Sequence, residues 1–231
     1  MKTILITGAT DGIGKQTAFN ISEYKHRIII VGRDEKKCQS VCAELSKKSS
    51  NDNIEYIICD LSLISDVKKL SSNIKNKFSK LDVLINNVGA LFLNREETQE
   101  GFEKTFALNH LSPFTLTLEL LDLLNDNNYA RIINVASAAH FNVIDKSIND
   151  EKNNRTFFEK LFFKTELDIN DLQAKNNYKG AQQYSCSKLM NILFTYKLET
   201  DYLKGTSTTT NCLHPGFVAS KFGHNNSGFF K

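Results

Sequence analysis

Six short apolar runs alternate with longer amphipathic segments, and this alternation constrains the fold more than any other feature of the chain. Residues 28–31 are all Ile or Val, which is typical of a parallel strand buried on both faces. The predicted strands are residues 3–7, 27–31, 54–59, 81–86, 131–136 and 209–214. The predicted helices are residues 13–24, 35–48, 65–78, 101–125 and 182–204. This order predicts an α/β fold, a doubly wound parallel sheet with helices on both faces and right-handed crossovers.

One segment breaks the alternation. Residues 141–181 are rich in Asn, Lys, Asp and Glu around an apolar patch at 157–163. The segment is too long for a plain loop, because connections in compact domains have a median of ~4–6 residues. We therefore predict a single domain over residues 1–231 with an insertion at about 141–181, which carries a short helix at 157–164 and lies over the catalytic edge. A disordered surface excursion is the alternative.

Charge, cysteine content and apolar length indicate which partners and which cellular compartment to expect. The net charge of +3 comes from interspersed charges of both signs, which argues against nucleic acid as a partner. The five cysteines form no paired framework, and Cys38 and Cys42 share a helix face without a second ligand pair. We predict free thiols and no metal site. No apolar stretch approaches the ~20 residues of a membrane span, and the first predicted strand leaves no room for a signal peptide. A soluble cytoplasmic protein is expected.

A glycine-rich loop joins the first predicted strand to the first predicted helix. Its sequence is Thr7-Gly8-Ala9-Thr10-Asp11-Gly12-Ile13-Gly14. Glycines allow a tight turn and close backbone approach to a pyrophosphate, whose charge the helix N-terminus attracts. A ligand-free turn between strand and helix is the alternative. The position between strand and helix favours a dinucleotide site in a Rossmann-type fold.

The end of the second predicted strand bears on the cofactor. An acid commonly binds a ribose 2′-hydroxyl at this tip, but here Gly32 is followed by Arg33, whose guanidinium suits a 2′-phosphate. Lys15 offers further positive charge, and Asp34 is expected to cap the next helix. The pattern favours NADP(H) over NAD(H); a merely solvated Arg33 is the alternative.

Polar residues also follow the third and fourth predicted strands. Asp60, with Leu61, is placed to read an adenine, although a helix N-cap at Asp60 or Ser62 fits equally well. The run Asn-Asn-Val-Gly begins at the end of the fourth strand. We expect the amides of its Asn pair, which ends at Asn87, to tie neighbouring strand ends, and Gly89 to let the backbone pass near a ribose.

Catalytic candidates come from the second half of the chain. Tyr184 and Lys188 are one helical turn apart, and an ammonium beside a phenol is expected to lower the pKa of the phenol. Ser137 lies at the tip of the fifth predicted strand, where a hydroxyl can bond a substrate carbonyl oxygen; an N-cap is the alternative. Pro113 is expected to kink its helix and free the Asn109 carbonyl for a water, unless it marks an ordinary irregularity.

Taken in order, these motifs resemble the short-chain dehydrogenase/reductase family over residues 1 to about 222. The motifs are Thr-Gly-x3-Gly-x-Gly, Asn-Asn-x-Gly, the helical Asn109, Ser137, Tyr184-x3-Lys188 and His214-Pro215-Gly216. Details such as Val31-Gly32-Arg33-Asp34 and Ser185-Cys186-Ser187-Lys188-Leu189-Met190-Asn191 are most similar to the retinol dehydrogenase and protochlorophyllide reductase branch, which usually prefers NADP(H).

The resemblance implies roles for the matching residues. In carbonyl reduction Tyr184 would be the general acid, Lys188 would bind the nicotinamide ribose, Ser137 would orient the carbonyl and Asn109 would hold a proton-relay water. The implied cofactor contacts are Gly8, Thr10, Asp11, Gly12, Ile13 and Gly14 to the pyrophosphate, Arg33 to the 2′-phosphate, Asp60 and Leu61 to the adenine, Asn87 and Gly89 on the adenosine ribose side, and Pro215, Gly216 and Val218 beside the nicotinamide.

Three departures qualify the resemblance. Val88 replaces the family's usual alanine, the insertion lengthens the gap between Ser137 and Tyr184, and the chain ends soon after Gly216. We therefore expect the usual seventh strand to be missing and the sixth strand to form an exposed edge.

The resemblance implies an NADP(H)-dependent oxidoreductase acting on the carbonyl or alcohol group of a small, lipophilic substrate, such as a retinal-like aldehyde or a ketone. The family also commonly forms homodimers through its long helices. The alternative is a non-catalytic NADP(H)-binding module whose insertion recruits a partner.

Overall fold

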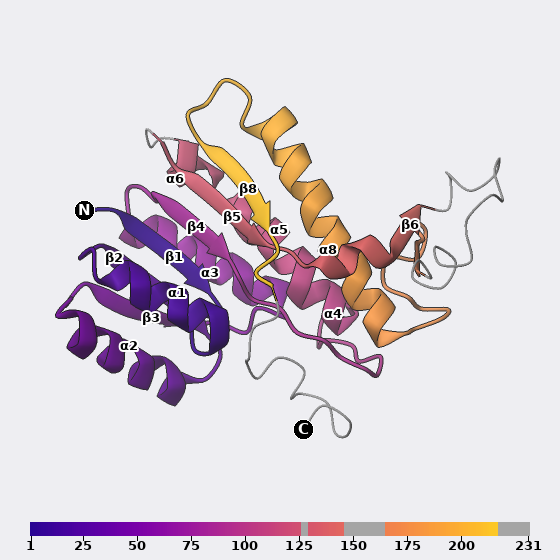
Figure 1. Cartoon of the computed structure of the whole chain (residues 1–231), viewed down its shortest axis with the longest axis horizontal. Coiled ribbons are helices and arrows are strands. Elements are labelled where there is room, and N and C mark those ends of the chain that lie inside the picture. Colours follow the sequence, from indigo (N-terminus) through magenta and orange to yellow (C-terminus); the bar gives the residue numbers. More distant parts are fainter. Residues whose placement is uncertain (126–128, 146–164, 217–231) are drawn as a thin grey trace.

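The computed structural model describes residues 1–125, 129–145 and 165–216 (Figure 1). Its main sheet has six strands in the order β3-β2-β1-β4-β5-β8, and all the pairs are parallel. These strands are β1 (Thr3–Thr7), β2 (Arg27–Gly32), β3 (Ile54–Ile58), β4 (Val83–Asn86), β5 (Arg131–Val135) and β8 (Thr209–Leu213). The predicted doubly wound α/β fold is confirmed. All six predicted strands are present, with bounds that differ by one or two residues.

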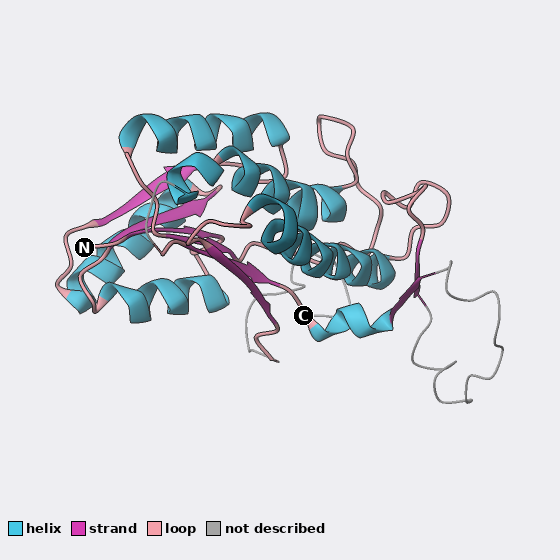
Figure 2. Ribbon diagram, turned by 90° about the horizontal axis from the view of Figure 1, so that it is seen from above, coloured by secondary structure: helices cyan, strands magenta, loops and turns pink. Residues whose placement is uncertain are grey.

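Helices connect the strands and cover both sides of the sheet (Figure 2). The α-helices are α1 (Gly12–Ser22), α2 (Glu35–Ser49), α3 (Ile64–Lys77), α4 (Lys104–Phe106), α5 (Ser112–Glu119), α6 (Leu121–Asn125) and α8 (Gly180–Lys197). The described residues also contain two π-helical turns, η1 (Ala107–Leu111) and η4 (Leu198–Tyr202), and one 3₁₀ turn, η2 (Ala138–Asn142). In the described ranges, no helix has both the length and the apolar character needed to cross a membrane.

The prediction of one continuous helix over residues 101–125 is wrong. The segment is divided into α4, the π-turn η1, α5 and α6. Pro113 lies in the first turn of α5, immediately after η1. Proline lacks the N–H that an α-helix would direct to residue 109, which explains why the helix changes its hydrogen-bond pattern there.

The sheet divides its side chains between two hydrophobic layers. Ile4 and Ile6 of β1 pack in a cluster with residues of α1 and α2, whereas Leu5 belongs to a cluster with α3, α5 and α8. Successive residues of a strand point to opposite faces, so an all-apolar strand supplies both layers. All five residues of β1 are buried, as expected for a central strand.

The strand β8 lies at one end of the described sheet, and β5 is its neighbour (Figure 1). Thr209 and Leu213 of β8 are exposed. The predicted exposed edge is therefore confirmed within the described residues.

The described parts of the predicted insertion contain an unexpected pair of parallel strands, β6 (Val143–Asp145) and β7 (Thr165–Leu167). Val143 and Leu167 pack against a cluster that includes Cys186 and Met190 of α8. The helix predicted at 157–164 lies outside the described residues. The strand pair thus lies beside the helix that carries Tyr184.

Candidate active site

The glycine loop has the conformation that its sequence predicts. Gly8 and Gly12 have φ of +65° and +51°, a left-handed region that favours glycine. A Cβ on Gly14 would lie only 2.5 Å from the Gly8 carbonyl oxygen and 2.4 Å from Asn87 Nδ2. Asp11 caps α1 by accepting a 2.8 Å bond from the Gly12 N–H. The loop and the N-terminus of α1 therefore form a cradle that suits a phosphate group.

Asn87 holds this loop against the end of β4. Its Nδ2 donates to the carbonyls of Thr7 and Gly8 at 2.9 and 3.2 Å. In return, the Thr7 hydroxyl oxygen accepts bonds from the backbone N–H groups of Asn87 and Val88. The prediction that an amide ties neighbouring strand ends is confirmed.

A cleft of about 400 Å³ runs over the carboxyl ends of β1 to β4. The predicted cofactor residues that line it are Gly8, Thr10, Asp11, Gly12, Ile13, Gly14, Arg33, Asp60, Leu61, Asn87 and Gly89. Phe92 and Leu108 add apolar walls that were not predicted. Ligands of open α/β sheets bind at such strand ends, and this lining fits a phosphate-bearing dinucleotide.

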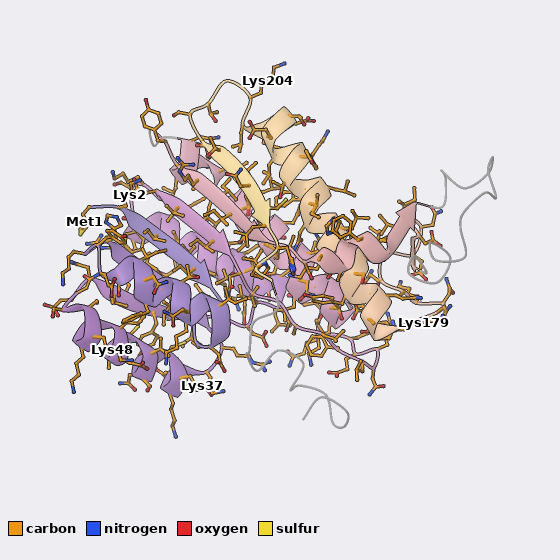
Figure 3. The ribbon with its side chains drawn as sticks, in the orientation of Figure 1. Met1, Lys2, Lys37, Lys48, Lys179 and Lys204 are labelled. Carbon is orange, nitrogen blue, oxygen red and sulfur yellow. The ribbon has the colours of Figure 1, made fainter. Side chains whose placement is uncertain are left out.

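The cations near the cleft differ from the prediction. Arg33 is exposed and lines the cleft. Lys37 in the first turn of α2, which is labelled in Figure 3, also lines the cleft and was not predicted. Asp34 is the N-cap of α2 and accepts a 3.0 Å bond from the Lys37 backbone N–H, so its predicted role is confirmed. A lysine in the first helical turn after Arg33 was the available sequence signal.

Lys15 does not supply free charge to the cleft. Its ammonium forms a 2.6 Å ion pair with Glu44 of α2, which also pairs with Lys48 at 2.8 Å. The hydrogen bonds from these two lysines lower the pKa of Glu44 to about 2. Lys15 therefore joins α1 to α2, and the prediction that it serves a 2′-phosphate is wrong.

The predicted N-cap at Asp60 or Ser62 is also wrong. Asp60 accepts bonds from the backbone N–H and the hydroxyl of Ser62, at 2.9 and 2.7 Å, and thereby closes a turn. The N-cap of α3 is Leu63, which makes no side-chain cap. Glu100 instead accepts bonds from the first two backbone N–H groups of α3, at 2.6 and 2.9 Å. A hydrogen bond with the Ser65 side chain, aided by these backbone bonds, lowers the pKa of the Glu100 carboxyl.

The catalytic candidates meet beyond the end of β5. Ser137 lies two residues after that strand and shares a hydrogen bond with the Tyr184 side chain. Lys188 is 3% exposed; its Nζ lies 5.6 Å from the centroid of the Tyr184 ring and donates a 2.9 Å bond to the Val135 carbonyl. The structure thus brings the serine beyond β5 together with the tyrosine and the lysine of α8.

The predicted electrostatics of this group are wrong in one respect. The pKa of Tyr184 is raised, because burial of the phenol outweighs the hydrogen bond with Ser137, which lowers it. Lys188 directs its ammonium to a backbone carbonyl, and complete burial lowers its own pKa to about 8. Burial therefore disfavours the charged form of both partners.

Ser137 is held by its own 3₁₀ turn. Its Oγ accepts a 3.2 Å bond from the Ala139 N–H, so the serine is the N-cap of η2 as well as the partner of Tyr184. The Ser137 carbonyl accepts a 2.6 Å bond from His140 Nδ1. A carbonyl oxygen only accepts, so His140 carries hydrogen on Nδ1. This tertiary detail had no sequence signal.

Asn109 lies in η1 and is fully buried. Its Oδ1 accepts from the Ala90 N–H and its Nδ2 donates to the Ala90 carbonyl, both at 2.9 Å, while Nδ2 also bonds Ser187 Oγ at 3.1 Å. The backbone carbonyl of Asn109 accepts a 2.8 Å bond from Asn191 Nδ2. The predicted irregularity at Pro113 takes the form of a π-turn, and the Asn109 carbonyl that was predicted to hold a water accepts from Asn191.

Gly89 connects the cleft with the catalytic group. It lines the cleft, and a Cβ on it would lie 3.1 Å from Lys188 Nζ and 3.6 Å from Asn109 Oδ1. Pro215 and Gly216 are absent from the described lining, but they follow β8, whose Leu213 carbonyl accepts a 2.8 Å bond from Ala136 beside Ser137. Val218 lies outside the described residues.

The cysteines are free thiols, as predicted. All five cysteines are free, and Cys38, Cys42, Cys59 and Cys186 are buried. Among the described residues, no group of three or more His, Cys, Asp or Glu side chains could hold a metal ion.

Comparisons with known proteins agree with this geometry. Human polyprenol dehydrogenase is 32% identical over 222 residues, which cover 94% of this chain and 61% of the relative. Human retinol dehydrogenase 13 is 34% identical over 222 residues, covering 96% of this chain and 60% of the relative. The chain thus spans about 60% of the length of these curated relatives.

Among solved structures, an uncharacterized protein from Mycobacterium paratuberculosis aligns with a TM-score of 0.74 and 28% identity, over 94% of this chain and 69% of that chain. A short-chain dehydrogenase from Sphingobium yanoikuyae has the same fold, with a TM-score of 0.72 and 20% identity over 96% of this chain and 73% of that chain. The profile of the short chain dehydrogenase family matches residues 2–147. This chain therefore belongs to the short-chain dehydrogenase family.

Proposed function

We propose that the chain is an NADP(H)-dependent oxidoreductase that exchanges hydride with the carbonyl or alcohol carbon of a small substrate. The observation that carries this proposal is the group formed by half-buried Ser137 and Tyr184 with buried Lys188, at the end of the sheet that also holds the glycine cradle. Family membership and the names of the curated relatives support an oxidoreductase.

The protein's own residues would handle the proton. A bound nicotinamide supplies or accepts the hydride. Tyr184 delivers a proton to the carbonyl oxygen during reduction, while the Ser137 hydroxyl bonds the same oxygen and orients it. Lys188 remains protonated near pH 7, because its pKa is about 8, and its charge near the phenol opposes the effect of burial. In this proposal the Asn109 carbonyl, which accepts a 2.8 Å bond from Asn191 Nδ2, also bonds a relay water.

The preference for NADP(H) rests on the two cations at the cleft. Arg33 and Lys37 are exposed and line the same end, and the second strand ends in Gly32 rather than in an acid. A Cβ on Gly32 would lie 2.7 Å from Thr10 Cγ2 and 2.8 Å from Cys38 Sγ, so a carboxylate side chain does not fit there. Arg33 and Lys37, together with a glycine rather than an acid at residue 32, favour a 2′-phosphate over a 2′-hydroxyl.

The proposed substrates are lipophilic aldehydes, ketones or alcohols. Curated relatives are named for polyprenol and retinol, which are both long apolar alcohols. Exposed Phe141, four residues after Ser137, adds an apolar side chain on the same side of the sheet.

Tyr184→Phe tests the function directly. We expect it to lower kcat by about 10²–10⁴-fold, the usual contribution of a general acid, with nearly unchanged NADPH affinity. The assay follows NADPH oxidation against a panel of aldehydes and ketones, with binding measured separately by fluorescence. Tyr196→Phe, on the same helix but 68% exposed, is the matched control.

The outcome also separates the two candidate functions. A Tyr184→Phe variant as active as wild type would remove the assigned acid. A wild-type protein that binds NADPH but turns over no substrate in the panel would favour the non-catalytic module.

A further inference from the structure

Asn191 of α8 uses both ends of its side-chain amide on the turn that carries Asn109. Its Nδ2 donates a 2.8 Å bond to the Asn109 carbonyl, and its Oδ1 lies 3.0 Å from His110 Nδ1. Asn191 is 4% exposed, and both contacts span about 80 residues of sequence. The side chain therefore joins α8 to the π-turn η1.

The chemistry of these partners fixes every hydrogen in the arrangement. A carbonyl oxygen only accepts, so the amide nitrogen of Asn191 must face Asn109 and the amide oxygen must face His110. His110 therefore carries its hydrogen on Nδ1. Burial lowers the pKa of His110, which keeps the ring neutral near pH 7. The ring is also packed 5.8 and 6.0 Å from the ring centroids of Phe106 and Phe114.

The π-turn η1, which Asn191 holds, also positions the backbone of residues 89 and 90 beside the active site. Asn109 binds both backbone groups of Ala90 through its side chain. The neighbouring Gly89 approaches Lys188 so closely that a Cβ would lie 3.1 Å from its Nζ. A shift of η1 would therefore move the Asn109 carbonyl and the backbone beside the Lys188 ammonium together.

We propose that Asn191 is a positioning residue of the active site, whose amide, oriented by His110 in the Nδ1–H form, holds the π-turn carbonyl of Asn109 in place for proton transfer. This proposal deepens the proposed function and rests on it. Asn191 acts through Asn109 and has no direct contact with the reacting atoms in this account. Turns of the π type recur at functional sites, and a backbone with a proline-imposed irregularity needs such a side-chain partner.

Asn191→Leu tests the proposal by removing both bonds at similar volume. We expect kcat to fall about tenfold to a hundredfold, the range that a small misplacement produces, with KM and NADPH affinity changed little. Thr195→Val is the matched control. Thr195 lies one turn later, where its hydroxyl accepts from Asn134 and donates to the Asn191 carbonyl at 3.0 and 2.8 Å. It removes buried bonds of similar length, leaves the Asn191 amide intact, and should keep kcat close to wild type.

Asn191→Asp keeps the shape and changes only the donor, so it remains informative if the leucine variant does not fold. A carboxylate cannot donate to the Asn109 carbonyl, whereas a protonated carboxyl can. We expect the ratio of its kcat to that of wild type to rise as the pH falls from 8 towards about 5, because burial raises the pKa of the new carboxyl. Tyr184 and Lys188 titrate in both proteins, so their effects on kcat largely cancel in the ratio. His110 donates to the new carboxylate and favours its charged form, so the rise in the ratio should come at the acidic end of this pH range.

Imidazole ¹⁵N chemical shifts of His110 give a readout that does not depend on turnover. Wild type should show the neutral Nδ1–H form at pH 7, and Asn191→Leu should lose it. The opposite tautomer in wild type, a pH-independent ratio for Asn191→Asp, or equal kcat losses in Asn191→Leu and Thr195→Val would each overturn the proposal. Wild-type inactivity on every substrate would instead contradict the proposed function, since the tautomer would still report whether the amide is oriented as inferred.

Discussion

The site has a cleft end, at the glycine loop, and a catalytic end, at Tyr184 and Lys188, and the two ends are formed by different parts of the chain. The cleft end uses backbone: Gly8 and Gly12 adopt positive φ, α1 presents its N-terminus, and the cations Arg33 and Lys37 stay in solvent. The catalytic end uses side chains: Lys188 is 3% exposed, and Ser137 and Tyr184 are half-buried. Under the proposed roles, the end that binds anions is open to water and the end that transfers protons is largely shielded from it.

Hydrogen bonding at the two ends differs in the same way. At the cleft end, one amide, Asn87, holds the turn against β4. Below α8, polar side chains bond to one another across elements: Asn86 Nδ2 donates to Asn134 Oδ1 at 2.9 Å, and Asn134 Nδ2 donates to Thr195 Oγ1 at 3.0 Å. Removing a partner from a buried polar network costs stability, so the loss of one of these side chains should lower the free energy of unfolding.

The largest expected effect comes from Gly14→Ala, which disrupts the glycine loop at the cleft end. The new methyl group would meet the Gly8 carbonyl at 2.5 Å and Asn87 Nδ2 at 2.4 Å, so the cradle must open. We expect NADPH affinity to fall by more than about a hundredfold, together with a loss of about 1–3 kcal/mol of stability from overpacking. Isothermal titration and urea unfolding measure the two effects.

Gly101→Ala is the control for this variant. Gly101 has φ of +80° and no atom within 4 Å of an added Cβ, so alanine strains the backbone without touching the cleft. It should lose about 1–2 kcal/mol of stability and keep wild-type affinity. Unchanged NADPH binding in Gly14→Ala would show that the loop does not hold the phosphates.

The next effect concerns Lys188 and the pH dependence of the free energy of unfolding. The pKa of Lys188 is lowered to about 8 in the folded chain from an ordinary 10.5, so between these values the unfolded chain binds more protons. Stability therefore rises with pH across this window, and Lys188→Met lacks this contribution. From pH 8 to pH 10 we expect the free energy of unfolding of wild type to rise by about 2 kcal/mol relative to the variant.

Denaturant unfolding of both proteins at pH 8 and pH 10 measures this difference. All other titrating groups are shared, so they cancel in the comparison. A difference that is the same at both pH values would mean that Lys188 is not desolvated, and the contrast between the two ends would fail.

The smallest effect sharpens the role of the solvent-exposed cations. Arg33→Ala should weaken NADPH binding about tenfold and leave NADH binding nearly unchanged, because a charge-assisted bond to a phosphate is lost. Lys37→Ala should act in the same direction but less strongly, because its Nζ also lies 4.0 Å from Asp34. Lys48→Ala, near the other end of α2 and paired with Glu44, is the matched control. Equal weakening of both cofactors would contradict the 2′-phosphate assignment.

The sequence predicts the elements of the site far better than the links between them. Glycine spacing at residues 8–14 and the i, i+4 spacing of Tyr184 and Lys188 are local, so helix and turn geometry decide the outcome. The Asn191 bond to Asn109 spans 82 residues, and the Glu100 cap on α3 comes from 35 residues away. Such contacts depend on tertiary packing, which no local spacing encodes.

The electrostatic prediction failed for a related reason. Tyr184 and Lys188 share a helix face as predicted, but the depth at which that face is buried depends on the covering elements. Sequence gives the sign of a neighbouring charge and not the loss of water around it, and here burial dominates both pKa shifts.

The amide and hydroxyl side chains behind Tyr184 have one more consequence. Asn86, Asn109, Asn134 and Asn191 gain or lose no proton at any pH at which a protein stays folded. These four amides thus stay uncharged, and acidifying or alkalinising the solution leaves their own donors and acceptors unchanged. Bends in a rate-versus-pH curve would then report on the tyrosine, the lysine and the histidines beside them, and not on the amides.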